Sequence, residues 1–170
     1  DNLGYGKANN IGLKMVKTKY ALILNPDTTL HKEAIKKFFN FLEKNNNFAF
    51  LGPIQNYDKI DIKKYNHDTS NAYEVESIKG FAIFINMSKL PRIGFFDENF
   101  FLYLEEIDLC KRAKLIQEKI YVDQNIKIFH DGGKSVNQSF SHKIELTRNW
   151  HWMWSLFYFN KKHYNFFYAL

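Results

Sequence analysis

The sequence predicts an α/β fold in which helices flank a mixed, mainly parallel β-sheet. Apolar runs of strand length alternate along the chain with segments whose apolar residues recur at helical spacing. The first run, residues 20–24, is continuously apolar, which is typical of a strand buried on both faces of a parallel sheet. The length of 170 residues and the hydrophobic content of 45% fit one domain of ordinary size.

The first elements follow from periodicity and from one proline. Residues 9–16 are expected to form a helix, and residues 20–24 a strand. This strand is expected to end at Asn25-Pro26-Asp27, because proline cannot continue a central strand. Residues 35–44 predict an amphipathic helix. Its apolar face consists of Ile35, Phe38, Phe39 and Leu42.

The remaining elements are expected to be short strands, turns and one further helix. Strands are expected at 48–51, 74–78, 81–85, 120–122 and 126–129. A polar surface loop is expected over 56–71, an aromatic turn-rich stretch over 91–101, and a helix over 108–117. Because ten aromatic residues fall within 150–170, we treat 1–149 as the domain and 150–170 as a separate aromatic, helical segment.

Composition and charge exclude several classes of protein. No apolar run reaches the roughly 18 residues that a transmembrane helix needs. The single cysteine, Cys110, excludes a disulfide scaffold and a cysteine-based zinc site, and it favours a reducing compartment. The net charge of +6 admits a basic nucleic-acid-binding module as one alternative. The charge is nearly all lysine and is spread along the chain, so we expect anionic substrates or lipids and no specific nucleic acid.

Two polar groups stand where strands are expected to end. Asp27 follows a buried strand, at the position where ligands bind in open α/β sheets, and a carboxylate there suits a hard cation. The alternative is a plain turn or a helix cap. His130 ends a later strand, either as a metal ligand or as a satisfied histidine beside the glycine-rich stretch that follows.

Two further groups stand where helices are expected to begin. Glu105, Glu106 and Asp108 follow an apolar stretch, and clustered carboxylates beside apolar surface are typical of tuned general bases. The alternative is an acid-rich helix start that the helix dipole favours. The turn Gly4–Gly6 and Lys7 would suit an anion at a helix N-terminus, unless Lys7 simply faces solvent.

Together these segments resemble the family 2 glycosyltransferases with the GT-A fold, especially the bacterial rhamnosyltransferase-like branch. The matching segments are residues 2–12, 20–29, 79–80, 93–112 and 128–135, and their order and spacing agree over about residues 1–150. The resemblance implies a GT-A (Rossmann-like) sheet flanked by helices. In that family the strands that hold the nucleobase precede the segment at which this chain begins. We therefore expect residues 1–149 to form the C-terminal part of the domain, with a sheet incomplete at its N-terminus.

The resemblance also implies roles for single residues. Asp27, in an Asn-Pro-Asp form of the family's Asp-x-Asp motif, and His130 would hold Mg²⁺ or Mn²⁺ at the donor diphosphate. Glu106 would be the general base where the family usually has aspartate, and Glu105 is a candidate to share that role. The implied donor-binding residues are Lys7, Asn10, Asn25 and Gly80.

The function that the resemblance implies is an inverting, metal-dependent sugar transfer in bacterial surface polysaccharide synthesis. The donor would be a dTDP- or UDP-sugar and the acceptor a glycan or a lipid-linked glycan. We expect a cytoplasmic protein, peripheral at the inner face of the membrane. A non-catalytic or truncated remnant is the main alternative. Residues 150–170 are expected to pack on the domain or on a second subunit of a homodimer, or to lie in a membrane interface.

Overall fold

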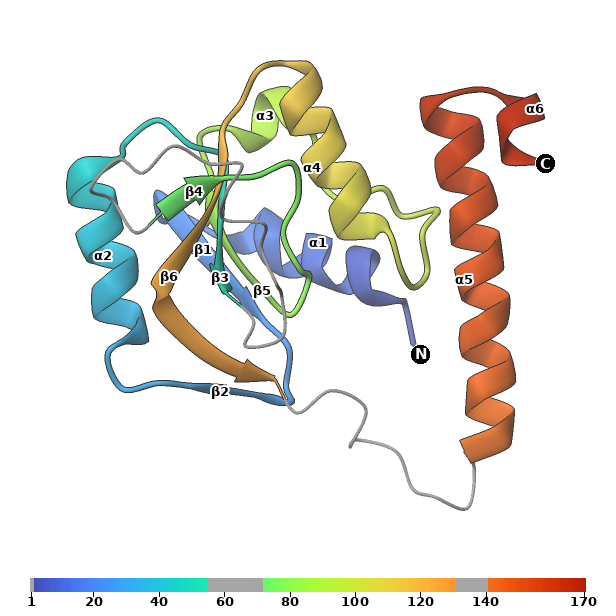
Figure 1. Cartoon of the computed structure of the whole chain (residues 1–170), viewed down its shortest axis with the longest axis horizontal. Helices are drawn as coiled ribbons and strands as arrows, with labels where there is room; N and C mark the ends of the chain where they lie inside the picture. The colour runs from blue at the N-terminus through green and yellow to red at the C-terminus, as the bar shows by residue number, and fades with distance from the viewer. Residues whose placement is uncertain (1, 55–71, 131–140) are drawn as a thin grey trace.

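The structure is a computed structural model that describes residues 2–54, 72–130 and 141–170. Figure 1 shows a central sheet with helices on both sides and one long helix outside these layers. The elements are α1 (Tyr5–Met15), β1 (Tyr20–Leu24), β2 (Thr28–Leu30), α2 (Ala34–Lys44), β3 (Phe50–Ile54), β4 (Ala72–Glu74), β5 (Ala82–Asn86), α3 (Leu90–Ile93), α4 (Glu105–Leu115), β6 (Ile120–His130), α5 (Ser141–His163) and α6 (Phe166–Ala169).

The described strands form a mixed sheet in the order β1-β5-β3-β6-β2, and β4 pairs with β6 beside this path. The α/β class and the mixed sheet are therefore confirmed. The expectation of mainly parallel pairing is wrong for these strands, because β3 and β6 are the one parallel pair among them. The reason is that β5 lies between β1 and β3 and runs antiparallel to both.

The core lies on both faces of this sheet. On one face, α2 packs Phe38 and Phe41 against the strands. On the other face, α1, α3 and α4 cover the sheet through an apolar cluster that includes Leu13, Leu90 and Leu109. Successive side chains of a strand point to opposite faces, so β5 supplies both clusters and all of its residues are buried. The alternating helix and strand pattern thus folds into a layered α/β domain.

Strand boundaries differ from the prediction where polar residues interrupt an apolar run. β6 is one strand, where two short strands were expected on either side of Asp123–Asn125. The β3–β6 register shifts between Pro53 and Ile54, and the Asp123 carboxylate accepts a hydrogen bond from the Asn125 backbone at 2.8 Å. The strand expected at 74–78 lies earlier, as β4, and Ile78 packs into the core instead. The loop expected over 56–71 lies outside the described residues.

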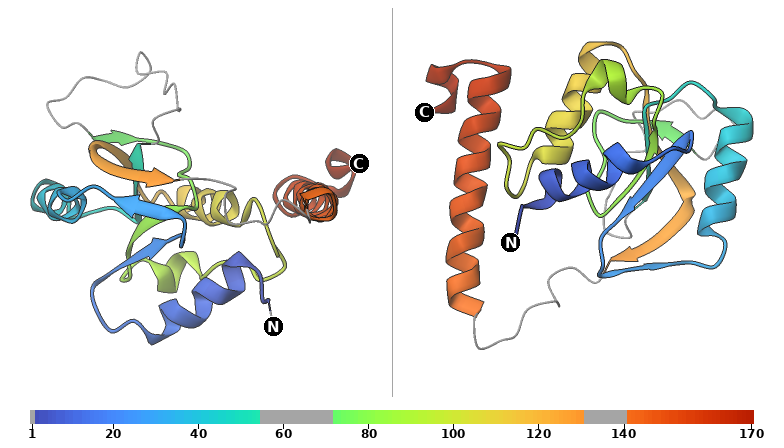
Figure 2. Two further views of the ribbon diagram at one scale, coloured as in Figure 1. Left: turned by 90° about the horizontal axis from the view of Figure 1, so that it is seen from below. Right: turned by 180° about the vertical axis from the view of Figure 1, so that it is seen from behind.

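The aromatic C-terminal segment is helical and lies against the domain. α5 begins at Ser141, before the expected boundary at residue 150. The Ser155 hydroxyl donates to the Leu102 carbonyl at 2.7 Å, and Lys162 and His163 both reach Asp108 of α4. Figure 2 shows α5 beside α4 and outside the helix–sheet–helix layers. Across the described segments, none of the helices is both long and apolar enough to cross a bilayer.

Candidate active site

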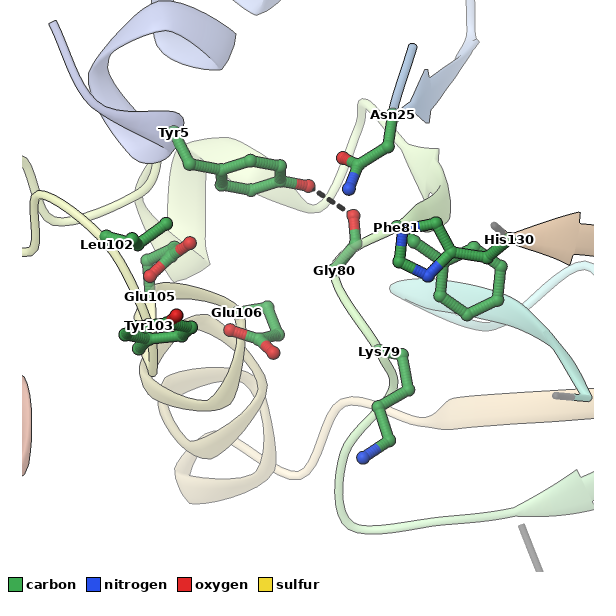
Figure 3. Close-up of a pocket in the computed structure, with 10 residues that line it drawn as sticks. All are labelled: Tyr5, Asn25, Lys79, Gly80, Phe81, Leu102, Tyr103, Glu105, Glu106 and His130. Atoms are coloured by element: carbon green, nitrogen blue, oxygen red, sulfur yellow. Dashed lines mark hydrogen bonds between the residues drawn. The ribbon is translucent and has the colours of Figure 1, made fainter. Parts of the chain in front are cut away.

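A pocket of about 290 Å³ opens where several elements end. It lies at the carboxyl ends of β1 and β6, before β5 and at the start of α4. Figure 3 shows the side chains that line it. They are Tyr5, Asn25, Lys79, Gly80, Phe81, Leu102, Tyr103, Glu105, Glu106 and His130. Segments from the whole length of the domain therefore meet at this point.

Asp27 and His130 form a pair beside the pocket, which His130 lines and Asp27 does not. The Asp27 Oδ1 and His130 Nε2 atoms are 3.3 Å apart, and each side chain is about one-fifth exposed. Local structure holds them there, because β2 places Thr28 opposite His130 of β6. The Phe81 ring stacks on the His130 imidazole with 4.9 Å between ring centroids and 6° between planes. This stacking holds the plane of the His130 ring, and the His130 Nε2 atom remains next to the Asp27 carboxylate.

The Asp27–His130 pair fits a divalent cation that has only a few protein ligands. The Asp27 carboxylate oxygen and the His130 ring nitrogen lie 3.3 Å apart, so these two side chains would hold the same ion. Within the described segments, no group of three or more metal-ligating side chains occurs. Mg²⁺ in proteins typically has one or two carboxylate ligands and takes further oxygens from water and substrate phosphates. The donor set present here therefore suits a cation that is completed by a phosphate ligand.

Glu105 and Glu106 stand in the first turn of α4, on the opposite wall of the pocket. Glu105 is only 5% exposed, and its Oε2 is the one buried side-chain oxygen or nitrogen without a hydrogen-bond partner in the described part of the chain. Burial, reinforced by the charge of Glu106, raises the pKa of Glu105 to about 7. This carboxyl group therefore exchanges its proton near neutral pH.

Burial also raises the pKa of Glu106, and several groups oppose that rise. Backbone hydrogen bonds at the start of α4 and at Gly80, together with the charge of Lys79, stabilise the ionised carboxylate. A carboxylate with a raised pKa and an open approach from a pocket has the properties of a general base. The two carboxyl groups therefore differ. Glu105 has a buried oxygen without a hydrogen-bond partner, whereas backbone groups donate hydrogen bonds to Glu106.

The backbone before these carboxylates is strained. Tyr103 and Leu104 have φ of 72° and 66°, the left-handed region that non-glycine residues rarely adopt. The Ser155 hydroxyl holds the preceding Leu102 carbonyl, and the Leu104 carbonyl accepts from the Asp108 backbone at 2.8 Å. Strain of this kind is stored where it positions functional groups, and here it directs the start of α4 into the pocket.

Tyr5 forms the roof of the pocket and was not predicted as a site residue. Its hydroxyl donates a hydrogen bond to the Gly80 carbonyl (Figure 3). Gly4 makes this placement possible, because its φ is 80° and a Cβ there would lie 2.5 Å from the Phe101 carbonyl oxygen. Burial and the nearby Glu106 and Glu105 raise the pKa of Tyr5, so its hydroxyl stays protonated as a donor. The one feature of the sequence that could have indicated Tyr5 is its position between Gly4 and Gly6.

The predicted donor-binding residues fall into two groups. Asn25 and Gly80 line the pocket, whereas Asn10 and Lys7 do not. Asn10 is buried, with its amide nitrogen 2.9 Å from the Phe96 carbonyl and its oxygen accepting from the Phe96 backbone at 3.0 Å. The structure therefore places Asn10 as a link between α1 and the segment before α4. Lys7 is exposed in the first turn of α1.

Lys79, Phe81, Leu102 and Tyr103 line the pocket without having been predicted. Lys79 and Phe81 flank a glycine that was predicted, and Leu102 and Tyr103 lie shortly before Glu105. Proximity in sequence to predicted residues was thus the only signal for them.

Comparisons with known proteins all identify glycosyltransferases as similar to this chain. The model of the family described as "Glycosyl transferase family 2" matches residues 1–123. The chain is 26% identical over 145 residues to the low-salt glycan biosynthesis hexosyltransferase Agl10 of Haloferax volcanii, covering 72% of this chain and 46% of that protein. It is 27% identical over 154 residues to the rhamnosyltransferase WbbL of Escherichia coli K12, covering 69% and 57%. The chain therefore spans about half the length of these relatives.

Solved structures share the fold at low sequence identity. A structure of GalNAc-T7 with UDP, GalNAc and Mn²⁺ superposes with a TM-score of 0.64 at 10% identity, covering 94% of this chain and 37% of that one. A structure of S. aureus TarS gives a TM-score of 0.56 at 18% identity, covering 74% and 24%. At these identities the likeness concerns the fold, and it confirms the expected GT-A arrangement.

Proposed function

The chain belongs to glycosyl transferase family 2, and from this premise we propose that its pocket transfers a sugar from a nucleotide-sugar donor to an acceptor hydroxyl. The observation that carries the proposal is the convergence of two chemically different groups on one cavity. The Asp27–His130 pair stands at one side, and the Glu105–Glu106 pair forms the other wall. Sugar transfer from a nucleotide-sugar requires one group that stabilises the leaving nucleoside diphosphate. It also requires one group that accepts the proton of the acceptor hydroxyl.

We assign the donor diphosphate to the side of Asp27 and His130. These two side chains would hold Mg²⁺ or Mn²⁺, which when bound neutralises the charge that develops on the departing diphosphate. Asn25 offers its side-chain amide to the donor from the end of β1. Gly80 leaves room for the sugar, because a Cβ at this position would already contact Tyr5 and Glu106 at 3.5–3.7 Å.

We assign the acceptor hydroxyl to the side of Glu106. Its carboxylate takes the hydroxyl proton while the hydroxyl oxygen bonds to the anomeric carbon of the sugar. The bond from that carbon to the diphosphate oxygen breaks on the opposite face, so the transfer inverts the anomeric configuration. Glu105, buried beside it, carries a proton or a charge according to pH and so modulates the basicity of Glu106.

The finer specificity follows the relatives. One is a hexosyltransferase and the other a rhamnosyltransferase, which supports hexosyl or rhamnosyl transfer. We propose a UDP- or dTDP-sugar as the donor. We propose a glycan or lipid-linked glycan as acceptor, in bacterial surface polysaccharide synthesis at the cytoplasmic side of the membrane.

A thermal-melting panel tests the donor site. The protein is melted with Mn²⁺ and UDP, dTDP, GDP or no nucleotide, as wild type, Asp27→Asn and Glu43→Gln. Ligand at 100 times its dissociation constant stabilises a protein by about 2.7 kcal/mol, which is roughly 5–10 °C for a chain of this size. We expect this shift with one nucleotide, dependent on Mn²⁺ and lost in Asp27→Asn.

Glu43→Gln is the matched control, since it removes one exposed carboxylate of α2, on the other face of the sheet. The shift should persist in this variant. Absence of any shift in the wild type would contradict donor binding and favour a non-catalytic remnant. A shift that survives Asp27→Asn would refute the assignment of the diphosphate to Asp27.

A further inference from the structure

α5 has two faces of different character. The inward face repeats at helical spacing through His151, Ser155, Tyr158 and Lys162, and each of these residues contacts the domain. His151 stacks on Phe101, Ser155 bonds to the Leu102 carbonyl, and Tyr158 and Lys162 bond to the Asp97 carboxylate at 3.0 and 2.7 Å. The orientation of α5 on the domain is therefore fixed by this face.

The outward face of α5 is apolar and exposed. It repeats through Leu146, Trp150, Met153 and Phe157, and the first three are 57%, 65% and 67% exposed. The apolar surface continues into α6, where Phe166 packs edge-on against Phe157 and Phe167 is 87% exposed. We call the surface of Leu146, Trp150, Met153, Trp154, Phe157 and Phe167 the aromatic face.

We propose that the aromatic face docks on an anionic membrane surface, with α5 lying in the interface plane. Tryptophan and tyrosine concentrate at membrane interfaces because their rings are apolar and their polar atoms stay hydrated. Trp150 and Trp154 supply such rings here, and Tyr164 and Tyr168 of the adjoining turn and α6 are 55% and 64% exposed. Since none of the described helices can span a bilayer, the contact would be one of binding along the surface.

Charge favours an anionic lipid surface over a second copy of the chain. Residues 141–170 contain four lysines and arginines and one glutamate. One of these cations, Lys162, is paired with Asp97 and Asp108 on the inward face, so it adds no charge to the aromatic face. Lys161 follows Phe157 by one helical turn and is exposed at the edge of the aromatic face. Two copies facing each other through this surface would oppose like charges, whereas anionic headgroups complement them.

Membrane docking would set the position of the proposed active site. The inward face of α5 touches Phe101 and Leu102, and Trp152 packs edge-on against Tyr103, at 5.7 Å between ring centroids. Leu102 and Tyr103 line the pocket. A helix with its side chains is about 10 Å across, so the pocket wall would lie about one helix diameter from the headgroups. Resting on the proposed function, this places the acceptor at or near the membrane surface.

Vesicle flotation tests the docking surface. The full chain is mixed with vesicles of phosphatidylcholine alone or with phosphatidylserine, and the test variant is Trp150→Ser/Met153→Ser/Phe167→Ser. The matched control is Met15→Ser/Phe39→Ser/Leu115→Ser, whose residues are 75%, 57% and 70% exposed elsewhere on the domain. We expect binding to the anionic vesicles, weakened at least roughly tenfold in the test variant and by less than about twofold in the control.

Three outcomes would overturn the proposal. These are no binding of the wild type to anionic vesicles, equal binding of wild type and test variant, and equal weakening in the control variant. Light-scattering mass measurements detect the rival partner, because a dimer that the test variant dissociates while vesicle binding is unchanged would assign the face to a second copy. Vesicle binding needs no nucleotide and the melting shift needs no vesicle, so this proposal and the proposed function fail separately.

Discussion

Glu106 is the residue on which the proposed chemistry depends most directly. It lines the pocket in the first turn of α4, and its pKa is raised by burial. Glu106→Gln keeps the size and removes the base, so we expect kcat to fall by about 10²–10⁴-fold. Donor binding should survive, as measured by the nucleotide-dependent melting shift. A parallel loss of turnover and donor binding would instead indicate a structural role for this side chain.

Glu105 makes stability depend on pH. Its pKa is about 7 in the folded chain against a usual 4.5, so the folded state binds more protons than the unfolded state between these values. The free energy of unfolding therefore falls as pH rises from about 4.5 to 7. Because Gln carries no charge, Glu105→Gln should equal wild type near pH 4.5 and exceed it at pH 8 by on the order of 3 kcal/mol.

Urea denaturation at the two pH values measures this effect. Glu43→Gln, which removes an exposed carboxylate, is the control and should follow the wild type at both. A Glu105→Gln variant with the same pH dependence as wild type would show that this carboxyl group is ionised without penalty.

The sequence indicated some contacts between single residues correctly and others not. Asp27 and His130 are separated by most of the domain in sequence, yet the structure brings their side chains to 3.3 Å of each other. The family resemblance implied that both hold one metal ion, and that role stays a prediction. Asn10 was assigned to the donor because the family resemblance implied it. Its partner is the Phe96 backbone, and no local pattern announces a contact between residues so distant along the chain.

At the scale of elements, α5 is held to α4 by a buried cluster of charges. Asp108 is fully buried and lies 2.9 Å from Arg112 Nε, 2.6 Å from Lys162 Nζ and 2.7 Å from His163 Nε2. Asp108→Asn leaves Arg112 and Lys162 without their shared carboxylate. His163 is a neutral hydrogen-bond partner in this cluster at pH 7, because burial lowers its pKa. Removing one partner of a buried charge pair costs about 3–5 kcal/mol, so we expect a loss near the lower value because Lys162 keeps Asp97.

Urea denaturation and limited trypsin digestion measure the effect. Glu76→Gln provides the control, since Glu76 is 85% exposed, lies 3.8 Å from Lys114 and should contribute less than about 1 kcal/mol. Faster trypsin cleavage after Lys161 and Lys162 in Asp108→Asn alone would show that α5 has been released. Unchanged cleavage there would mean that the aromatic contacts suffice to hold the helix.

Elements with a strong pattern of apolar residues could be predicted from the sequence. Elements that exist because they pair with a distant strand could not. β1 was predicted with its observed bounds because a continuous apolar run ends at a proline. The bounds of α2 were predicted to within one residue. Its predicted apolar face was partly wrong, because Phe41 is buried whereas Ile35 and Phe39 are exposed. β2 has only three residues and exists because it pairs with the end of β6, which is tertiary information. The same pairing carries Asp27 to His130, so an unpredicted element positions a predicted site.

At the scale of the whole molecule, the candidate site is assembled from both faces and both ends of the domain. α1 supplies Tyr5, β1 leads to Asn25, β5 follows Gly80 and α4 begins with the carboxylates. The sequence and its family resemblance indicate Asn25, Gly80 and the carboxylates separately, and they do not indicate Tyr5. Their meeting in one cavity depends on the strand order, in which β5 separates β1 from β3, and local patterns do not encode that order.

This assembly predicts that one ligand protects several distant segments at once. Binding of the preferred nucleotide with Mn²⁺ should slow amide hydrogen exchange together in 25–30, 79–81 and 102–106, because all three meet at the pocket or at the Asp27–His130 pair. α2 packs on the other face of the sheet and should show little change, which makes it an internal control. Asp27→Asn should remove the protection in all three segments. Protection confined to 25–30 would mean that the carboxylates of α4 face a separate cavity, and the transfer mechanism would then lose its base.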